Sequence, residues 1–474
     1  MKSQVYKNAC KLGFFLILKD RIYFSLLQII SEKRGEKMGS LWSDITHAER
    51  FDSLKENIKT DVLIIGGGMA GLLTAYMLKK RGVDCALVDA GRICSGTTQN
   101  TTAKLTYQHG LIYDKLIRSM GKEKAALYLD AHRTALEQYK ELSSEIECDY
   151  EIKDSYVYSK RDIGKIEKEI MALNSLGIKA EYSDAKILPI EVAAAVRVPN
   201  QAQFNPLKFA FSISRGLPIY ENTKVKELSV GRAVTEHGEI RCEKIIVATH
   251  FPFINKHGSY FLKMYQHRSY VLALAGASDV GGMWVDEDER GLSLRNYDNL
   301  LLLGGGAHRT GKSGGSYAEL ERASRIYYPD AQIKYRWAAQ DCMTLDKIAY
   351  IGQYSRRTPN LYVATGFNKW GMSSSMLSAM ILSDMMCERE NEYAELFSPS
   401  RSMLHPQLLL NAAEAILGLL TPTVPRCPHL GCALKYNAAE HSWDCSCHGS
   451  RFSESGELIN NPATDGKKDM PKKS

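Results

Sequence analysis

Two cysteines and two histidines near the C-terminus have the side chains and the spacing to hold a metal. Cys427-Pro-His429 has the pattern C-x-H, and Cys445-Ser-Cys447-His448 follows with C-x-x-H after fifteen intervening residues. Thiolate and imidazole groups together bind either structural zinc or an iron-sulfur cluster in which histidines replace two cysteines. C-x-H is tighter than the spacings usual for structural zinc, so the pattern favours the iron-sulfur alternative and leaves zinc open.

A glycine-rich turn near residue 66 could bind phosphate groups. The apolar run Asp61-Val-Leu-Ile-Ile65 predicts a buried strand, and it leads into Gly66-Gly-Gly68-Met-Ala-Gly71, which has the pattern G-x-G-x-x-G. Gly66 allows the tight turn, Gly68 lets the backbone approach a pyrophosphate, and Gly71 lets the following helix pack closely. The next predicted strand ends at Asp89, whose carboxylate can accept hydrogen bonds from ribose hydroxyls. A generic strand-to-helix turn is the alternative, but strand, helix and acidic residue together favour a dinucleotide site.

The segment after Asp89 separates FAD from NAD. It reads Arg92-Ile-Cys-Ser-Gly-Thr-Thr-Gln-Asn-Thr-Thr-Ala-Lys-Leu105, and with it the chain resembles the D-amino-acid oxidase (DAO) superfamily of FAD-dependent oxidoreductases, which includes glycine and sarcosine oxidases. The resemblance implies FAD as the cofactor. Gln99 stands where close relatives often have glycine, which leaves the path of this loop open. The residues that inherit contacts to ribose, pyrophosphate and isoalloxazine are Asp89, Gly96, Thr97, Thr98, Thr102, Ala103 and Lys104.

Two later strands resemble the remainder of such a flavin site. Ile245-Ile-Val-Ala-Thr249 is similar to the second cofactor-contacting strand, and Thr223-Lys-Val225 to the adenine-side strand. Leu361-Tyr-Val-Ala-Thr-Gly366 repeats the pattern and continues into a helix predicted over residues 373–386, whose N-terminus would favour negative charge. Ordinary sheet core is the alternative for these strands. The contacts implied by the resemblance are Val225, Ala248, Thr249, Gly366, Phe367, Lys369, Gly371 and Met372.

The middle of the chain predicts a mixed substrate domain. Helical spacing covers residues 122–147 and 163–176, and strands are expected at 269–275, 283–286, 292–296 and 299–303. Polar groups that could face a substrate are His109, His267, Arg268, Arg295, Arg309 and Lys369. A solvated face or a structural ion pair is the alternative for each arginine. No general base is required, because flavin can accept hydride directly from the carbon beside an amine nitrogen. The catalytic candidates are therefore only His109, Arg268 and Lys369.

The C-terminal segment resembles Rieske proteins from Cys427 through Trp443, Phe452, Gly456 and Pro462. The resemblance implies a [2Fe-2S] cluster held by Cys427, His429, Cys445 and His448, and a disulfide between Cys432 and Cys447. Residues 38–470 as a whole are similar to a bacterial family of DAO-like flavoproteins with a C-terminal Rieske domain.

The Rieske segment departs from the usual pattern in two places. Rieske domains normally carry several strands before the first cluster loop, but here residues 408–420 predict an apolar helix directly before it. Asn461 also replaces a glycine that commonly precedes the proline of the third loop. We therefore expect a truncated segment, and residues 421–474 are too few to build much core without a metal or a neighbouring domain.

Two apolar runs near the N-terminus, residues 12–18 and 22–30, are separated by Lys19-Asp20-Arg21. Each is shorter than the roughly 20 residues that span a bilayer, and no small-residue cleavage site follows, so neither a membrane span nor an export signal is expected. Arg34-Gly35-Glu36-Lys37 can be encoded by a purine-rich ribosome-binding sequence, so one hypothesis is that translation starts at Met38. An amphipathic N-terminal helix is the alternative.

Composition supports a globular enzyme in a reducing compartment. The 474 residues are 44% hydrophobic and 24% charged, and the net charge of +7 is spread along the chain, so nucleic-acid binding has no special support. Four of the eleven cysteines fall between residues 427 and 447 while the others are scattered, which favours a local redox site and a cytoplasmic location over a disulfide scaffold.

The predicted fold is α/β, with a Rossmann-like FAD-binding domain, an interleaved α+β substrate domain and a small β-type Rieske segment. The expected order is an N-terminal extension (1–59, of which 1–37 could be untranslated), a DAO-like domain (60–398), a linker helix (399–420) and the Rieske segment (421–474). FAD-binding parts are expected at about 60–120, 200–255 and 340–395, and substrate parts at about 121–199 and 256–339.

These features predict an FAD-dependent oxidoreductase that oxidises a small amine, amino acid or imino acid and passes electrons from FAD to the Rieske cluster. Histidine ligation raises the cluster potential to about −150 to +300 mV, so the cluster can accept electrons from a flavin. The final acceptor would then be a protein or a quinone. The alternatives are a non-catalytic redox sensor, and a flavoprotein oxidase with an inert C-terminal segment.

Overall fold

The computed structural model describes residues 36–47, 49–254, 257–312, 314–422, 425–468 and 470. The two N-terminal apolar runs and the segment before Glu36 lie outside the described residues. Among the described residues, no helix is long and apolar enough to cross a membrane.

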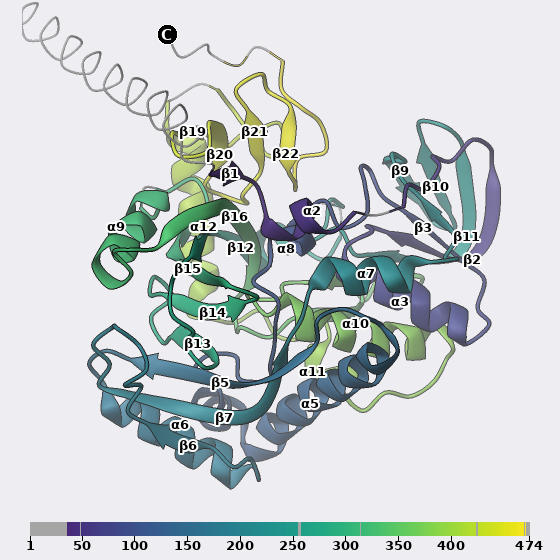
Figure 1. The fold of residues 1–474 in the computed structure, drawn as a ribbon. Helices are drawn as coiled ribbons and strands as arrows, with labels where there is room; N and C mark the ends of the chain where they lie inside the picture. Colours follow the sequence, from purple (N-terminus) through teal and green to yellow (C-terminus); the bar gives the residue numbers. More distant parts are fainter. Residues whose placement is uncertain are drawn as a thin grey trace, which may run out of the picture.

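The cofactor half of the chain is an eight-stranded sheet covered by helices (Figure 1). Its central strand carries the run Val62 to Ile65, which is buried on both faces as the continuous apolar pattern predicts. The helix that follows the glycine turn packs against another helix from the far end of the flavoprotein part. In order, the strands are β17 (Tyr350–Gln353), β18 (Leu361–Thr365), β11 (Glu239–Val247), β2 (Ile58–Ile65), β3 (Cys85–Val88) and β8 (Ile219–Tyr220), and a meander of β9 (Val225–Ser229) and β10 (Arg232–Thr235) joins β11.

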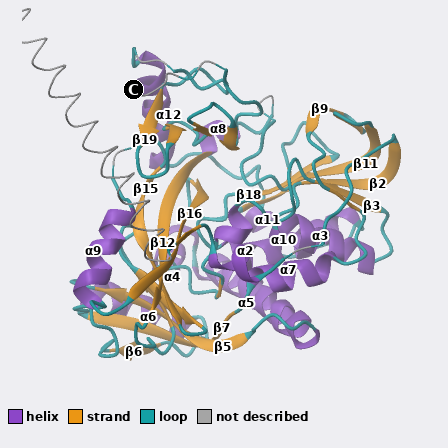
Figure 2. Cartoon of the chain, turned by 45° about the horizontal axis from the view of Figure 1, so that its top comes forward, coloured by secondary structure: helices purple, strands orange, loops and turns teal. Residues whose placement is uncertain are grey.

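The substrate half is a ten-stranded mixed sheet that lies beside the cofactor half (Figures 1 and 2). Its order is β1 (Lys37–Met38), β16 (Gln332–Thr344), β12 (Met264–Ala275), β15 (Leu300–Arg309), β14 (Ser293–Tyr297), β13 (Met283–Asp286), β5 (Glu151–Ser159), β7 (Ala194–Gln203) and β4 (Lys104–Leu105), with β6 (Glu181–Ser183) on β7.

The expected helices and strands of the middle of the chain are all present, but two strands are longer than expected: β12 begins at Met264 and β15 continues to Arg309. Local caps fix several helix starts. The Asp162 side chain accepts from the Lys165 amide at the start of α6, and Asn205 accepts from two amides at the start of α7. The described helices are α2 (Leu41–Ile45), α3 (Met69–Lys80), the short 3-10 helix η1 (Thr97–Asn100), α4 (Tyr113–Met120), α5 (Lys122–Glu145), α6 (Ile163–Ser175), α7 (Pro206–Ser214), α8 (Tyr260–Lys263), α9 (Tyr317–Tyr327), α10 (Gly371–Met386), α11 (Ala394–Phe397) and α12 (Pro406–Leu420).

The C-terminal segment forms one four-stranded antiparallel sheet at the end of the substrate half, drawn yellow in Figure 1. Its strands are β19 (Leu434–Asn437), β20 (Ser442–Cys445), β21 (Arg451–Ser453) and β22 (Leu458–Asn460). All four follow the first cluster loop in sequence, and the element before that loop is α12. The segment therefore has no strands of its own ahead of Cys427 among its described residues, as expected.

The start of the described chain is part of the flavoprotein fold. Trp42 is fully buried, and its indole nitrogen donates to the Thr101 carbonyl at 2.7 Å. Glu36 pairs with Arg336, and Lys37 and Met38 extend the substrate sheet beside β16. This part of the expected N-terminal extension thus contacts both the cofactor loop, through Trp42, and β16, through Glu36 to Met38.

Candidate functional site: a flavin cavity against a Rieske loop

A cavity of about 640 Å³ lies between the two halves of the flavoprotein part. Its wall includes the glycine turn, the small-residue loop after Asp89, and the carboxyl ends of β11 and β18. A ligand between these elements would contact both the cofactor sheet and the substrate sheet, as a flavin requires. The predicted cofactor residues that line it are Gly66, Gly68, Asp89, Gly96, Thr97, Thr98, Thr102, Lys104, Val225, Ala248, Thr249, Gly366, Phe367, Lys369, Gly371 and Met372.

The glycine turn has the close backbone contacts that only glycine allows. Gly66 has a φ of +112°, and a Cβ there would lie 2.5 Å from the Ala248 carbonyl oxygen. A Cβ on Gly71 would lie 1.9 Å from the Gly66 carbonyl oxygen, so Gly71 shapes the turn without lining the cavity. Gly68 is the N-cap residue of α3, so the positive end of a twelve-residue helix faces the cavity. The turn therefore fits a pyrophosphate.

Asp89 holds the turn and the next loop together. Its Oδ2 accepts from the Gly67 amide at 2.7 Å and its Oδ1 from the Gly91 amide at 2.8 Å. Burial raises the pKa of Asp89, and these two backbone bonds oppose that shift. Each carboxylate oxygen keeps a further lone pair, so a ribose hydroxyl can still donate to it. The loop is tied in by Thr98, whose hydroxyl accepts from the Met69 amide at 3.1 Å.

The rest of the cofactor loop is more enclosed. Ala103 is fully buried with a φ of +53°, and it does not line the cavity. Lys104 does line it, and its ammonium donates to the Thr102 hydroxyl at 3.1 Å. Burial, followed by the nearby Arg295, lowers the pKa of Lys104 to about 7.

The substrate side of the cavity carries charges that the sequence did not single out. Asp341 on β16 faces it, and burial raises the pKa of this carboxyl to about 6 although Lys369 opposes the shift. Glu289 and Lys347 also line the cavity and form an ion pair at 2.7 Å. The substrate side of the cavity therefore carries a carboxyl group, Asp341, and an amine, Lys369, both partly buried.

His109 lines the cavity as a neutral ring. Its Nε2 lies 2.9 Å from the Thr106 carbonyl, which only a protonated nitrogen can satisfy, and its Nδ1 lies 2.7 Å from the Tyr128 hydroxyl. Burial lowers the pKa of His109 to about 3, and the ring stacks on Trp370 at 4.8 Å. These contacts suit a packing and orienting role rather than that of a general base.

Three arginines named as candidates lie away from the cavity wall. Arg268 makes a bidentate ion pair with Glu440 of the C-terminal segment. Arg309 donates to the Ser446 carbonyl at 3.1 Å and the Cys447 carbonyl at 3.2 Å. Arg295 is fully buried and donates to the Ala103 carbonyl at 3.3 Å. Arg268 therefore forms a structural ion pair, which was the alternative to a substrate contact. Arg309 holds the second cysteine-histidine loop by its main chain. The candidate His267 lies with its Nδ1 3.6 Å from Glu289, whose side chain is half exposed.

The two Cys-x-His loops meet in space. The sulfurs of Cys432, Cys445 and Cys447 lie within 4.8 Å of one another, and the imidazoles of His429 and His448 are 4.9 Å apart. Burial lowers the pKa of His429 to about 4 and that of His448 to about 3, so both rings are neutral at pH 7, the state that binds metal.

The donor set fits an iron-sulfur cluster. The buried Nδ1 of His448 has no hydrogen-bond partner among the described residues, as expected of a nitrogen that serves as a ligand. Cys427 and Cys445 are both buried, at 2% and 1% exposure. The structure brings Cys432 and Cys447 together as thiols, under Gly418 of α12, and their disulfide stays a prediction.

The third loop of the C-terminal segment reaches the flavin cavity. The Asn461 amide donates to the Thr249 carbonyl at 2.7 Å and to the Phe251 carbonyl at 2.6 Å, directly after β11. A glycine at position 461 could make neither bond, which explains the departure from the usual pattern. The residues of this segment that line the cavity are Leu458, Asn461, Ala463 and Thr464.

Comparison with known families assigns both parts of the chain. Residues 61–385 match the DAO model of FAD-dependent oxidoreductases, and residues 406–471 match the Rieske [2Fe-2S] domain. The chain belongs to the DAO family of FAD-dependent oxidoreductases. It is an enzyme with a C-terminal Rieske domain, and its cofactors are FAD and a [2Fe-2S] cluster. The zinc alternative is thereby set aside.

Individual relatives share this arrangement in whole or in part. The Bacillus subtilis protein YhfW, named as a Rieske 2Fe-2S iron-sulfur protein, is 35% identical over 89% of this chain and 95% of its own length. The gamma-glutamylputrescine oxidoreductase of Escherichia coli is 23% identical over 77% of this chain and 93% of its own length.

Solved structures share the fold of the flavoprotein part. The L-proline dehydrogenase of P. horikoshii has a TM-score of 0.63 at 18% identity, and it covers 73% of this chain and 98% of its own. The glycine oxidase of Geobacillus kaustophilus has a TM-score of 0.62 at 19% identity, over 73% of this chain and 99% of its own.

Proposed function

We propose that the chain oxidises a small amine, amino acid or imino acid at the flavin and delivers the electrons through the Rieske domain to a separate protein or quinone acceptor in the cytoplasm. FAD accepts two electrons with a proton from such substrates, and a Rieske cluster carries one electron at a time. The names of the relatives support the substrate class, because they include oxidoreductases of an amine, of proline and of glycine.

The residues around the cavity would bind and orient the substrate. Asp341 can pair with a substrate ammonium and Lys369 with a carboxylate or carbonyl, so the two together suit a molecule that carries an amino nitrogen. His109 and the stacked Trp370 close one wall and exclude water from it. The N-terminus of α10, at Gly371, points positive charge at the cavity and would favour the electron-rich ring of reduced FAD.

One observation carries the electron-transfer part of the proposal: the third Rieske loop forms part of the wall of the flavin cavity. Asn461 and Thr464 from the Rieske domain and Thr249 from the cofactor sheet line the same space. No large rearrangement of the chain is needed to bring the two cofactors into one electron path. The Asn461 bonds to the carbonyls of Thr249 and Phe251 tie this loop to the cofactor part, which favours the electron path over an inert C-terminal segment.

The test is a substrate screen under anaerobic conditions on the purified holoprotein, with iron, zinc and flavin quantified first. We expect at least one amine, amino acid or imino acid to bleach the flavin absorption and then to produce the EPR signal of a reduced Rieske cluster. Flavin reduction by substrate with a cluster that stays oxidised would contradict the electron path. A failure of every compound of these classes to reduce the flavin would contradict the substrate class.

A further inference from the structure

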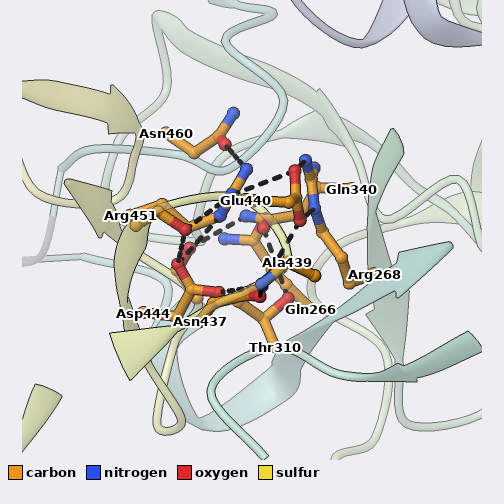
Figure 3. Close-up of polar contacts among 12 residues, drawn as sticks. Gln266, Arg268, Thr310, Gln340, Asn437, Ala439, Glu440, Asp444, Arg451 and Asn460 are labelled. Atoms are coloured by element: carbon orange, nitrogen blue, oxygen red, sulfur yellow. Dashed lines mark hydrogen bonds and ion pairs between the residues drawn. The ribbon is translucent and has the colours of Figure 1, made fainter. Parts of the chain in front are cut away.

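The Rieske domain is docked on β12, β15 and β16 through buried polar groups. Arg268 of β12 forms an ion pair with Glu440 (Figure 3). Glu440 also pairs with Arg451 at 3.1 Å, and Arg451 pairs with Asp444 at 3.0 Å. The side chains of Arg268 and Glu440 are only 7% and 11% exposed. Because buried charges tolerate few geometries, this network fixes one orientation of the domain.

Two glutamines extend this interface to the histidine-bearing cluster loop. The Gln266 amide donates to the His448 carbonyl at 2.7 Å and to the Asn461 carbonyl at 3.1 Å. The Gln340 amide donates to the Gly449 carbonyl at 2.8 Å and to the side-chain oxygen of Gln266. Both glutamine residues are 2% exposed, so water does not compete for these bonds.

The main chains of the two parts also approach each other closely at this interface, at two glycines. Gly449 has a φ of +86°, and a Cβ there would lie 2.7 Å from the Gln266 Cβ. Gly311 similarly lets its backbone approach Ser446, since a Cβ would lie 2.5 Å from the Ser446 nitrogen. The residue after the cluster ligand His448 therefore rests directly on the flavoprotein sheet.

Gln340 also reaches the flavin site with its backbone. Its carbonyl oxygen accepts from His250 Nε2 at 2.8 Å and from the Thr97 hydroxyl at 3.4 Å, and both of these residues line the flavin cavity. One residue thus bonds the flavin loop through its main chain and the cluster loop through its side chain. Asn461 offers a second link, since its side chain bonds the Thr249 carbonyl at the cavity and its own carbonyl accepts from Gln266.

We propose that Gln340, acting with Gln266, is a positioning residue that couples the flavin site to the histidine loop of the Rieske cluster. The proposal rests on the proposed electron path and adds a structural reason for it. FAD bound against Thr97 would restrain this loop and the β16 backbone beside it, and the Gln340 side chain would pass that restraint to the carbonyls of Gly449 and, through Gln266, of His448. The cluster environment then depends on whether FAD is bound.

The test replaces Gln340 with methionine in the full-length holoprotein, which keeps the side-chain length and removes the amide. Gln332→Met is the matched control, because Gln332 lies on the same strand with an exposed side chain outside the interface. We expect Gln340→Met to keep its FAD and iron, to shift the EPR spectrum and reduction potential of the cluster, and to slow single-turnover electron transfer from reduced FAD to the cluster about tenfold. Gln332→Met should match the wild type in all three measurements.

A second measurement needs no substitution. In wild-type protein the EPR spectrum of the dithionite-reduced cluster should differ between FAD-replete and FAD-depleted samples, and in Gln340→Met this difference should disappear. Identical spectra of the two wild-type samples would overturn the coupling even if the variant loses iron. A Gln340→Met protein with wild-type EPR, potential and transfer rate would overturn it as well. If FAD never reduces the cluster in wild-type protein, the proposed function fails, while the FAD-dependent spectrum still decides the role of Gln340.

Discussion

The ion pair between Arg268 and Glu440 gives a quantitative prediction about how firmly the Rieske domain is docked. Replacing Arg268 with methionine keeps most of the apolar volume and leaves Glu440 buried with Arg451 as its remaining charged partner. Removing one partner of a buried pair costs about 3 to 5 kcal/mol. Because Arg451 stays 3.1 Å from the carboxylate, we expect the low end, about 3 kcal/mol.

The pKa of Glu440 reports the net effect of burial and of both arginines on this carboxylate. Burial by itself would raise this pKa, but Arg268 and Arg451 outweigh burial and bring it from 4.5 to about 2. The carboxylate is thus more acidic in the folded state, so it stabilises folding above pH 4.5 and loses that contribution as the pH falls toward 2. A shift of this size corresponds to about 3 kcal/mol at neutral pH.

The assay follows the two cofactors separately during denaturation at pH 7. Visible circular dichroism of the cluster should show Arg268→Met losing about 3 kcal/mol in the transition of the Rieske domain, while the release of FAD fluorescence should be nearly unchanged. The double variant Arg268→Met with Glu440→Gln should recover part of the loss, because the side chain at 440 is then neutral and Arg451 keeps Asp444 at 3.0 Å as its charged partner. Lys186→Met is the control, since this exposed lysine pairs only with Asp184 at the surface, and it should change neither transition. An unchanged cluster transition in Arg268→Met, or an equal shift in both transitions, would refute this account of docking.

Three further predictions address the cofactors directly. Gly71→Ala should purify without FAD, because its Cβ would lie 1.9 Å from the Gly66 carbonyl oxygen, and the absorption spectrum at 450 nm is enough to check this. Cys445→Ser should lose the iron and keep the flavin, which iron and flavin quantitation will show; equal loss of both would mean that the flavin part cannot fold alone. Asn461→Ala removes two partly buried hydrogen bonds and should destabilise the Rieske domain by about 1 to 3 kcal/mol, seen as a lower midpoint of cluster loss. Asn461→Asp would place a charge beside the Thr249 carbonyl and should cost more.

The sequence predicts well those parts of the site whose geometry is local. The turn at Gly66 to Gly71 and the strand that leads into Asp89 are each marked by a short stretch of adjacent residues, and the structure has them at the expected positions. The spacing of Cys427 to His448 is local in the same sense. Each of these motifs also carries an unusual residue requirement, so a short stretch of sequence is informative.

The contacts between domains could not be predicted in this way. On β16, Asp341 faces the flavin cavity and the Gln340 side chain faces the cluster loop, because successive side chains of a strand point to opposite faces. The alternation is visible in the sequence only after the strand is known to lie between two sites. Arg268 is a similar case, since its partner Glu440 is 172 residues away and the sequence around neither residue predicts the ion pair. Long-range pairing decided whether this arginine faced substrate or protein.

The polar character of the interface follows from the small size of the Rieske domain. Its buried apolar cluster consists of a few side chains, four of them cysteines at the metal site, with Trp443 and Phe452 as the large members. So small a core cannot stabilise the domain alone, and burying more apolar area against the flavoprotein part would hold the domain without fixing its orientation. Hydrogen bonds and ion pairs such as those of Gln340 and Arg268 do fix the orientation, because each is satisfied in one arrangement only. Under the proposed electron path, in which the domain presents its cluster to the flavin, a polar interface therefore serves better than a larger apolar one.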